Sequence, residues 1–352
     1  MDISKLVRDN VRKMKKYASA RDEFTGKAKV FLDANENSFG SSVNKDLNRY
    51  PEPVPKKLRM AIGEYKGIDN PEKIFLGNGS DEAIDLVIRA FCEPRKDSIM
   101  LLPPTYGMFS VCAQLNDVNI MEVALEPDFS LNVDEIIAKA NAEKPKVIII
   151  CTPNNPSANV YDKDDIERIL KNVPSLVIVD EAYIDFSTKA SWLERLDEFN
   201  NIIVIQTFSK AWGMAGVRLG MAFANPEIIE ILNKIKYPYN INDVTTSIVL
   251  EAVKNPSLKE DLVSKIKTER HYLMNHLAEI SVVNEVLDSE ANFFLARFDE
   301  PKTIYEYLSD EGIVVRDRSD QLHCEGCLRI TVGTREQNDM LLHALKKYSE
   351  ER

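Results

Sequence analysis

Polar side chains follow three strongly apolar segments in the middle of the chain. The segments cover residues 146–153, 176–183 and 202–210. Asn155 follows the first segment, whereas Asp180 and Lys210 lie toward the ends of the other two. Continuous apolar runs are typical of strands covered on both faces, and ligands bind outside the carboxyl ends of strands in open α/β sheets. If the strands are parallel, an amide, a carboxylate and an amine meet in one crevice.

Those three groups predict a particular cofactor. A lysine that forms a Schiff base, together with a carboxylate beside the pyridinium nitrogen, is the set with which proteins operate pyridoxal phosphate. Lys210 and Asp180 fit these two roles. Asn155 and Tyr183 would donate hydrogen bonds to the phenolic oxygen of the ring, which stabilises its anion. Lys210, Asp180 and Tyr183 are therefore the candidate catalytic residues.

A glycine-containing turn at residues 77–83, GNGSDEA, predicts the site of the cofactor's phosphate. The turn joins a short apolar segment to a helical pattern, and free N–H groups at a helix N-terminus attract anions. Gly79, Ser80 and Asp81 would supply those amides. Further contacts are expected from Thr207, Ser209 and Arg218. The carboxylates of Asp81 and Glu82 would then have to point elsewhere or bind another part of the cofactor.

The order of apolar and helical patterns predicts an α/β fold. Between residues 73 and 210 they alternate, which is typical of a large domain with a mostly parallel sheet covered by helices on both faces. After residue 242 a long charged helical stretch and then short strands with two helices indicate a smaller α+β domain. We expect an N-terminal arm that forms part of the small domain (1–40), a large cofactor-binding domain (41–242) and a C-terminal small domain (243–352).

Composition argues against several classes of protein. The formal charge of -11 argues against a nucleic-acid partner, because binding to phosphate backbones requires clustered Lys and Arg. The sequence contains no run of eighteen apolar residues, which is the length that would predict a membrane span. Its N-terminus lacks the apolar segment of a signal peptide. Asp2 and Asp9 interrupt the basic start, which argues against a transit peptide. We expect a cytoplasmic protein without a membrane partner.

The cysteines and histidines predict no metal site. The five cysteines are odd in number and form no dense framework, which suits a reducing compartment. Cys324 and Cys327 form a single CxxC pair, without the second pair of a zinc site or the helical start of a thioredoxin-type site. None of the four histidines has a second histidine and a carboxylate at helical spacing.

Several motifs resemble those of the class I/II aminotransferases of fold type I. The run TFSKAWGMAGVRLG, which contains Lys210, is similar to the lysine motif of that family, PNNPSAN to its Asn-Pro loop, and VDEAYIDF to its aspartate strand. More specifically, LDANEN, RYPEP, GNGSDE and LRITVGTREQN resemble the histidinol-phosphate aminotransferases. The similarity extends from residue 17 to the last helical pattern, so the resemblance implies this fold for nearly the whole chain.

The resemblance also implies an activity and further site residues. The activity would be pyridoxal 5'-phosphate-dependent transamination between histidinol phosphate and 2-oxoglutarate, giving imidazole-acetol phosphate and glutamate in histidine biosynthesis. Tyr106 would stack on the cofactor ring, and Tyr50 would reach the phosphate of the neighbouring subunit's cofactor in a homodimer. The implied substrate contacts are Tyr17, Asn35, Arg316 and Arg329. One departure from the family is Ala158, where glycine is usual, and alanine tolerates a positive φ less well.

The same residues leave alternatives open. Taken singly, a lysine after a strand is usually a solvated surface group, and an aspartate there can be a helix cap. The turn GNGSDE would suit a nicotinamide-dependent oxidoreductase, but Glu82 stands where the dinucleotide fingerprint needs a glycine or a small residue. A ligand-sensing regulator of the same fold would lack the lysine or carry a DNA-binding module. Threonine-phosphate decarboxylase and a broad aromatic aminotransferase remain open, because the same lysine and aspartate serve those reactions.

Overall fold

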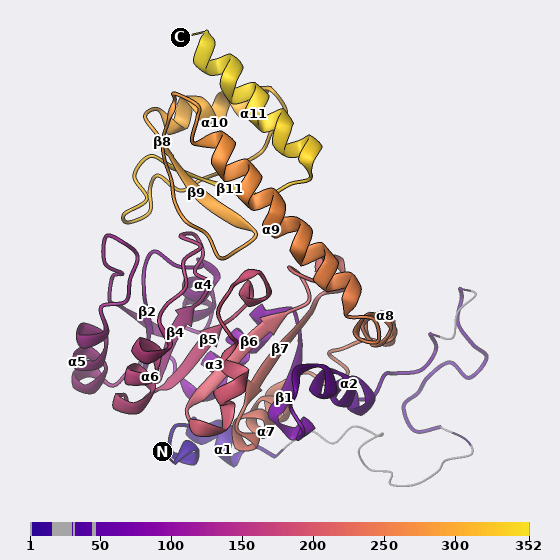
Figure 1. The fold of residues 1–352 in the computed structure, drawn as a ribbon. Coiled ribbons are helices and arrows are strands. Elements are labelled where there is room, and N and C mark those ends of the chain that lie inside the picture. Colours follow the sequence, from indigo (N-terminus) through magenta and orange to yellow (C-terminus); the bar gives the residue numbers. More distant parts are fainter. Residues whose placement is uncertain (1, 16–29, 31, 44–46, 352) are drawn as a thin grey trace.

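Two β-sheets joined by a long helix form the body of the computed structural model (Figure 1), which describes residues 2–15, 30, 32–43 and 47–351. The larger sheet has the strand order β1-β7-β6-β5-β4-β2-β3, and the smaller sheet has the order β10-β11-β9-β8. The connecting helix is α9 (Ser257–Leu277), which runs from the larger unit to the smaller one. The structure therefore confirms the predicted fold class of a large α/β unit and a smaller α+β unit.

Helices cover both faces of the larger sheet. Its strands are β1 (Ile74–Asn78), β2 (Ser98–Leu101), β3 (Asn119–Glu122), β4 (Val147–Cys151), β5 (Leu176–Asp180), β6 (Ile202–Thr207) and β7 (Leu219–Ala224). The helices around it are α2 (Lys56–Lys66), α3 (Ser80–Phe91), α4 (Met108–Leu115), α5 (Val133–Glu143), α6 (Lys163–Asn172), α7 (Pro226–Ile235) and α8 (Asp243–Val253). Short 3-10 turns are η2 (Pro71–Lys73), η3 (Ile184–Phe186), η4 (Trp192–Glu198) and η5 (Ala215–Val217).

The three apolar segments form the central strands because both of their faces are buried. Every residue of β4, β5 and β6 is buried. Alternate side chains enter different cores: Ile148 and Ile150 pack with α2, α5 and α6, whereas Val147 and Ile149 pack with α3, α4 and α7. The strands β4, β5 and β6 pair in parallel, as expected, so their carboxyl ends share one edge.

The sequence expectation did not include β7, which is the antiparallel strand of the larger sheet. It pairs with β6 on one side and with β1 on the other. Gly220 of β7 lies against the backbone of Gly79 and Ser80, so closely that a Cβ atom at this position would overlap both. This close approach of two backbones fixes the start of α3 at the edge where β4, β5 and β6 end.

The smaller sheet packs one face on helices and turns the other toward the larger unit. Its strands are β8 (Val283–Val286), β9 (Phe293–Phe298), β10 (Arg316–Asp317) and β11 (Cys327–Thr331), and its helices are α10 (Pro301–Asp310) and α11 (Arg335–Glu350). Phe294, Leu328 and Ile330 join the core beneath α9, α10 and α11. Leu295 and Cys327, on the opposite face, join a core of the larger unit.

Two expectations about the ends of the larger unit need correction. The N-terminal segment was expected to complete the small domain, yet η1 (Ile3–Lys5) and α1 (Asp9–Lys13) pack on the larger unit, where Ile3 and Val11 are buried beside α3 and α7. The long helical stretch expected after residue 242 is two helices, because α8 ends at Val253 and α9 begins at Ser257, after its N-cap residue Pro256. The proposed boundaries at residues 40 and 242 remain a prediction.

Replacing Gly220 by alanine should lower the stability of the protein. The added Cβ would overlap the backbone of Gly79 and Ser80, which cannot rotate away as a side chain would. We expect the free energy of unfolding to fall by about 3 kcal/mol, the upper range for overpacking. Urea denaturation measures this change. Gly216→Ala is the matched control, because a Cβ there meets no atom within 4 Å; equal stability of both variants would contradict the packing described.

Candidate active site

A cavity of about 190 Å³ lies at the carboxyl ends of β4, β5 and β6. Its lining contains most of the residues that the sequence analysis singled out for the cofactor. These are Gly79, Ser80, Asp81, Tyr106, Asp180, Tyr183, Thr207, Ser209, Lys210 and Arg218. The parallel strands therefore bring the predicted amine and carboxylate to one place, together with the predicted helix N-terminus.

Asp180 is a buried carboxylate at the last position of β5. Its side chain is 3% exposed, and Oδ1 accepts a hydrogen bond from the N–H of Ala182 at 3.0 Å. Burial raises the pKa of Asp180 to about 7, which outweighs the lowering by the Ala182 N–H and by Lys210. A carboxylate in such a place is stabilised by a cationic hydrogen-bond donor, because a buried charge must be paired.

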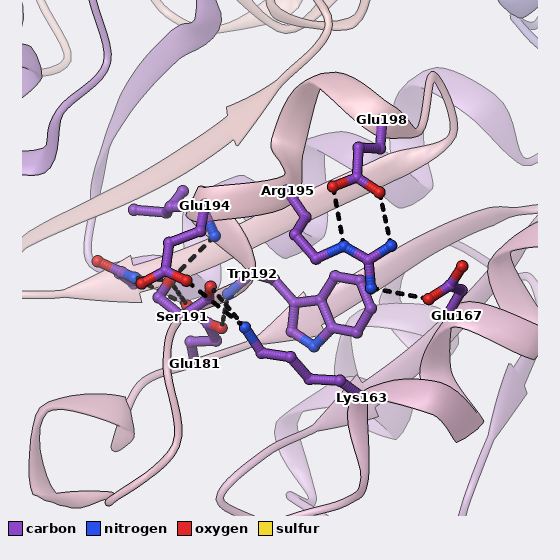
Figure 2. Close-up of polar contacts among 10 residues, drawn as sticks. Lys163, Glu167, Glu181, Ser191, Trp192, Glu194, Arg195 and Glu198 are labelled. Atoms are coloured by element: carbon purple, nitrogen blue, oxygen red, sulfur yellow. Dashed lines mark hydrogen bonds and ion pairs between the residues drawn. The ribbon is translucent and has the colours of Figure 1, made fainter.

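The carboxylate of the next residue, Glu181, anchors the end of β5 through three hydrogen bonds (Figure 2). Its buried carboxylate accepts hydrogen bonds from Ser191 Oγ at 2.5 Å, from the N–H of Trp192 at 2.7 Å and from Gln206 Nε2 at 2.8 Å. The first two contacts join β5 to η4. Arg195 lies between Glu167 and Glu198 and covers the ring of Trp192. These contacts hold the peptide next to Asp180 on a rigid support.

Lys210 follows β6 and brings its amine to the same cavity. Its Nζ lies 5.5 Å from the centre of the Tyr183 ring. Burial lowers the pKa of Lys210, and the positive charge of Arg329 lowers it further, whereas Asp180 raises it. The protonation equilibrium of the amine is thus shifted toward its neutral, nucleophilic form. This is the direction required for covalent catalysis by lysine.

Asn155, Tyr183 and Arg329 form a chain of contacts at the mouth of the site. Asn155 Nδ2 donates to Tyr183 Oη at 3.4 Å, and Arg329 Nη1 donates to Asn155 Oδ1 at 2.6 Å. Burial raises the pKa of Tyr183 well above its usual range, so its hydroxyl remains a donor at neutral pH. Because Asn155 belongs to the larger unit and Arg329 to β11, these contacts connect the two units across the site.

The turn at Ala158 has the conformation that glycine usually supplies. Ala158 is fully buried with a φ of 62°, and its N–H donates to the carbonyl of Asn154 at 2.8 Å. The departure from the family pattern is therefore accommodated in the turn that holds Asn155, although a left-handed alanine costs on the order of 1 kcal/mol.

The opposite end of the cavity has the features of an anion site. Gly79 has a φ of 76°, and a Cβ there would lie 2.7 Å from Arg218 Nη2. The hydroxyls of Thr207 and Ser209 lie 3.0 Å apart beside this turn. Glu82 faces away from it, since its Oε2 accepts from the N–H of Asn78 and from Asn240 Nδ2. Amide groups, two hydroxyls and a guanidinium group therefore converge there, while Asp81 also lines the cavity.

The other residues expected to contact the cofactor or the substrate are only partly gathered. Arg316 pairs with Arg329 across β10 and β11. Tyr106 contacts Phe109 edge to face, with ring centres 5.4 Å apart, and burial raises its pKa to about 12. Tyr50 stacks on Tyr239 and is 53% exposed. Asn35 belongs to the same N-terminal segment, away from the cavity lining, and Tyr17 lies outside the described residues.

Some residues at the cavity were missed by the sequence analysis. Cys151 and Ala215 line it, and Phe293 lies edge to face with Tyr183 at 4.9 Å between ring centres. Cys151 could have been found, because it ends β4 beside Asp180 in the strand register. Phe293 comes from the smaller unit, and nothing in its local sequence indicates this contact.

The thiols of the CxxC pair are packed in a core. Cys324 and Cys327 are both fully buried, and burial raises their pKa values to about 12 and about 11. In the described part of the chain no group of His, Cys, Asp and Glu is arranged to hold a metal ion. Nor does any described helix have the length and apolar character that crossing a membrane requires.

The donor set of the cavity fits pyridoxal 5'-phosphate. A buried carboxylate suits a protonated ring nitrogen, the lysine amine suits the aldehyde, and the turn at Gly79 with Arg218 suits the phosphate. A side chain at position 79 would fill the space beside Arg218. The three requirements come from separate elements, and each is met by a group of the expected chemistry.

Comparison with known proteins agrees with this geometry. The family model described as "Aminotransferase class I and II" matches residues 21–345. A histidinol-phosphate aminotransferase from Cytophaga hutchinsonii is 49% identical over 346 residues, which covers 98% of this chain and 99% of the relative. The nicotinamide alternative is therefore set aside.

Solved structures share the same fold. The histidinol-phosphate aminotransferase from Clostridium acetobutylicum superimposes with a TM-score of 0.80 at 25% identity, covering 87% of this chain and 92% of that one. That from Sinorhizobium meliloti, in complex with pyridoxal-5'-phosphate, gives a TM-score of 0.80 at 21% identity, covering 90% of each chain. The chain therefore belongs to the class I and II aminotransferases, in the group of the histidinol-phosphate aminotransferases.

Proposed function

We propose that the protein transfers the amino group of L-histidinol phosphate to 2-oxoglutarate, forming imidazole-acetol phosphate and glutamate, as a step of histidine biosynthesis in the cytoplasm. The observation that carries this proposal is the convergence of Lys210 and Asp180 in one cavity, with Arg329 beside them. Family membership and the names of the relatives support the substrate assignment.

Pyridoxal 5'-phosphate is the cofactor in this proposal, and when bound it supplies an electron sink for a carbanion at the substrate α-carbon. Asp180 would hold the ring nitrogen, and Asn155 and Tyr183 would hold the phenolic oxygen. Tyr106 would cover the ring. The residues of the cavity lining that would bind the phosphate are Gly79, Ser80, Asp81, Thr207, Ser209 and Arg218.

Lys210 has two tasks. Its amine would hold the cofactor covalently, and once free it would take the α-proton of the substrate and return a proton during transfer. A general base works best when its pKa lies near the working pH. The lowered pKa of Lys210, caused first by burial and then by Arg329, is in that direction.

Arg329 binds the anionic group of each amino donor, and Arg316 provides a second contact. Both donors are anions, since histidinol phosphate carries a phosphate and glutamate carries carboxylates. A guanidinium group binds either with two parallel hydrogen bonds. The contact between Arg329 and Asn155 fixes this guanidinium group relative to the cofactor's phenolic oxygen.

The working form in this proposal is a homodimer with shared active sites. Residues 32–43 and 47–50 extend away from the body of the molecule (Figure 1), and they expose many apolar side chains. The exposed apolar residues of this segment are Leu32, Phe39, Val43, Leu47 and Tyr50. An exposed apolar segment of this kind is covered by a partner, and a second copy would place Tyr50 at the neighbouring cofactor.

Mass analysis of the product tests the activity. The purified holoenzyme is mixed with L-histidinol phosphate without a keto acid, and the absorbance of the cofactor is followed. We expect the band of the lysine-bound cofactor to be lost and one equivalent of imidazole-acetol phosphate to appear. Turnover of phosphothreonine with release of carbon dioxide, and none of histidinol phosphate, would assign the decarboxylase reaction instead. Faster turnover of aromatic amino acids would assign an aromatic aminotransferase.

Replacing Lys210 by alanine should abolish turnover while leaving the fold intact. The variant lacks the amine that moves the proton, and removal of such a group lowers kcat by at least about 10³-fold. Steady-state kinetics and circular dichroism measure the two effects. Lys265→Ala, on an exposed part of α9, is the control. Wild-type rates in the Lys210 variant would remove this residue from the mechanism.

Asp180 should make the cofactor-free protein less stable as the pH rises. Its pKa is raised from 3.8 to about 7 in the folded chain, so the folded form binds a proton that the unfolded form releases. The stabilising contribution of Asp180 is then fully present below about pH 4 and is lost as the pH rises to about 7, by as much as about 4 kcal/mol. Asp180→Asn should abolish that part of the pH dependence in urea titrations, whereas Asp261→Asn, at an exposed position, should leave it. Parallel profiles for wild type and Asp180→Asn would show that Asp180 is not perturbed.

Shared active sites predict complementation between two inactive variants. In a mixed dimer of Lys210→Ala and Tyr50→Ala chains, one site has the lysine of one chain and the tyrosine of the other. After unfolding and refolding together, about a quarter of wild-type activity should return, because half of the dimers are mixed and each has one intact site. Activity no greater than the mean of the separate variants would contradict a shared site.

A further inference from the structure

Three arginine side chains gather on the face of the smaller sheet that is turned toward the larger unit. Arg316 of β10 lies opposite Arg329 of β11, and the N–H of Arg318 donates to the carbonyl of Cys327 at 3.0 Å. Residues 316 and 318 are therefore on the same side of their strand, as are 327 and 329 on theirs. Cys327 is buried in a core of the larger unit, which shows where this side points.

Within the described part of the chain these guanidinium groups have no acidic partner. Among the described residues, no carboxylate oxygen lies within 4.0 Å of a nitrogen of Arg316, Arg318 or Arg329. Burial lowers the pKa of Arg318, and the charges of Arg329 and Arg316 lower it further, while Asp320 opposes them. The repulsion among like charges without counterions is unfavourable, and a bound anion reduces this repulsion.

Arg318 also has a donor that the protein leaves unused. Its Nε–H is buried and has no hydrogen-bond partner in the structure. An unsatisfied buried donor costs about 1–3 kcal/mol, so such groups call for an explanation. Arg329, by contrast, is tied to Asn155 at the cofactor end of the site.

The anionic groups of the two amino donors differ in their number of charges and acceptor oxygens. A carboxylate has one charge and two oxygens, and a single guanidinium fork satisfies it. A phosphate monoester has up to two charges and three acceptor oxygens, so it has room for a second guanidinium group. Each of the two carboxylates of glutamate is therefore satisfied by one arginine, whereas the single phosphate group of a phosphorylated donor gains from two or more.

We propose that Arg318 binds the phosphate group of the amino donor together with Arg329, and that it thereby sets the preference of the site for a phosphorylated amine. This inference rests on the proposed function. It adds to the Arg329 and Arg316 contacts a residue that directly follows the short strand β10 and continues its pairing with β11.

The test compares Arg318→Gln with the wild-type holoenzyme on three donors: L-histidinol phosphate, L-histidinol and L-glutamate. We expect the KM for L-histidinol phosphate to rise about tenfold or more, because a hydrogen bond to a charged group is lost. The KM for L-glutamate and the kcat values should stay within about twofold, and the preference for histidinol phosphate over histidinol should fall by about the same factor as the KM rises. Arg318→Lys, which keeps the charge but not the fork, should lie between the two.

Lys346→Gln is the matched control, because it removes one positive charge from an exposed position on α11. An equal rise of both KM values, or a fall of kcat with unchanged KM, would show a general structural role and overturn the inference. A KM for L-histidinol phosphate within about twofold of wild type would overturn it as well. No turnover of L-histidinol phosphate by the wild type would overturn the proposed function, and this inference with it.

Discussion

The burial of one carboxylate, that of Asp180, is the constraint on which the rest of the site depends. It lies at the end of β5 between two other fully buried strands, and it receives one hydrogen bond from its own loop. A charge in this place is unfavourable unless a cation faces it. In the proposed function the protonated ring nitrogen of the cofactor would be this cation, so the binding of the cofactor and the ionisation of Asp180 would stabilise each other.

The surrounding elements keep the other groups at fixed positions relative to this carboxylate. Glu181 ties the strand end to η4, while the contact between Gly79 and Gly220 sets the start of α3. Lys210 comes from the neighbouring strand and Arg329 from the smaller sheet. The proposed chemistry therefore needs both sheets: the larger unit would supply the amine, the carboxylate and the turn that binds the anion, and the smaller unit would supply the arginines.

Features of the fold and of the site could be predicted from the sequence where a local run of residues determines them, and were missed where a tertiary contact does. The apolar runs of β4, β5 and β6 were evident because both faces of these strands are buried, and the parallel arrangement then placed Asp180 and Lys210 together. Strand β7 was missed because LGMAFA follows the lysine motif without a turn signal that separates it, and its close packing on Gly79 is a tertiary contact. Phe293 and Arg318 were missed for a similar reason, since their positions follow from the way the smaller sheet faces the larger one.

In the proposed function, cofactor binding ionises a carboxyl group that is protonated in the cofactor-free protein. Infrared difference spectroscopy at about pH 6, with and without pyridoxal 5'-phosphate, measures this ionisation directly. We expect the carbonyl stretch of a protonated carboxyl group to disappear when the cofactor binds, and the Asp180→Asn variant to show no such change. The same spectrum in both states of the wild type, or an equal change in the variant, would contradict it.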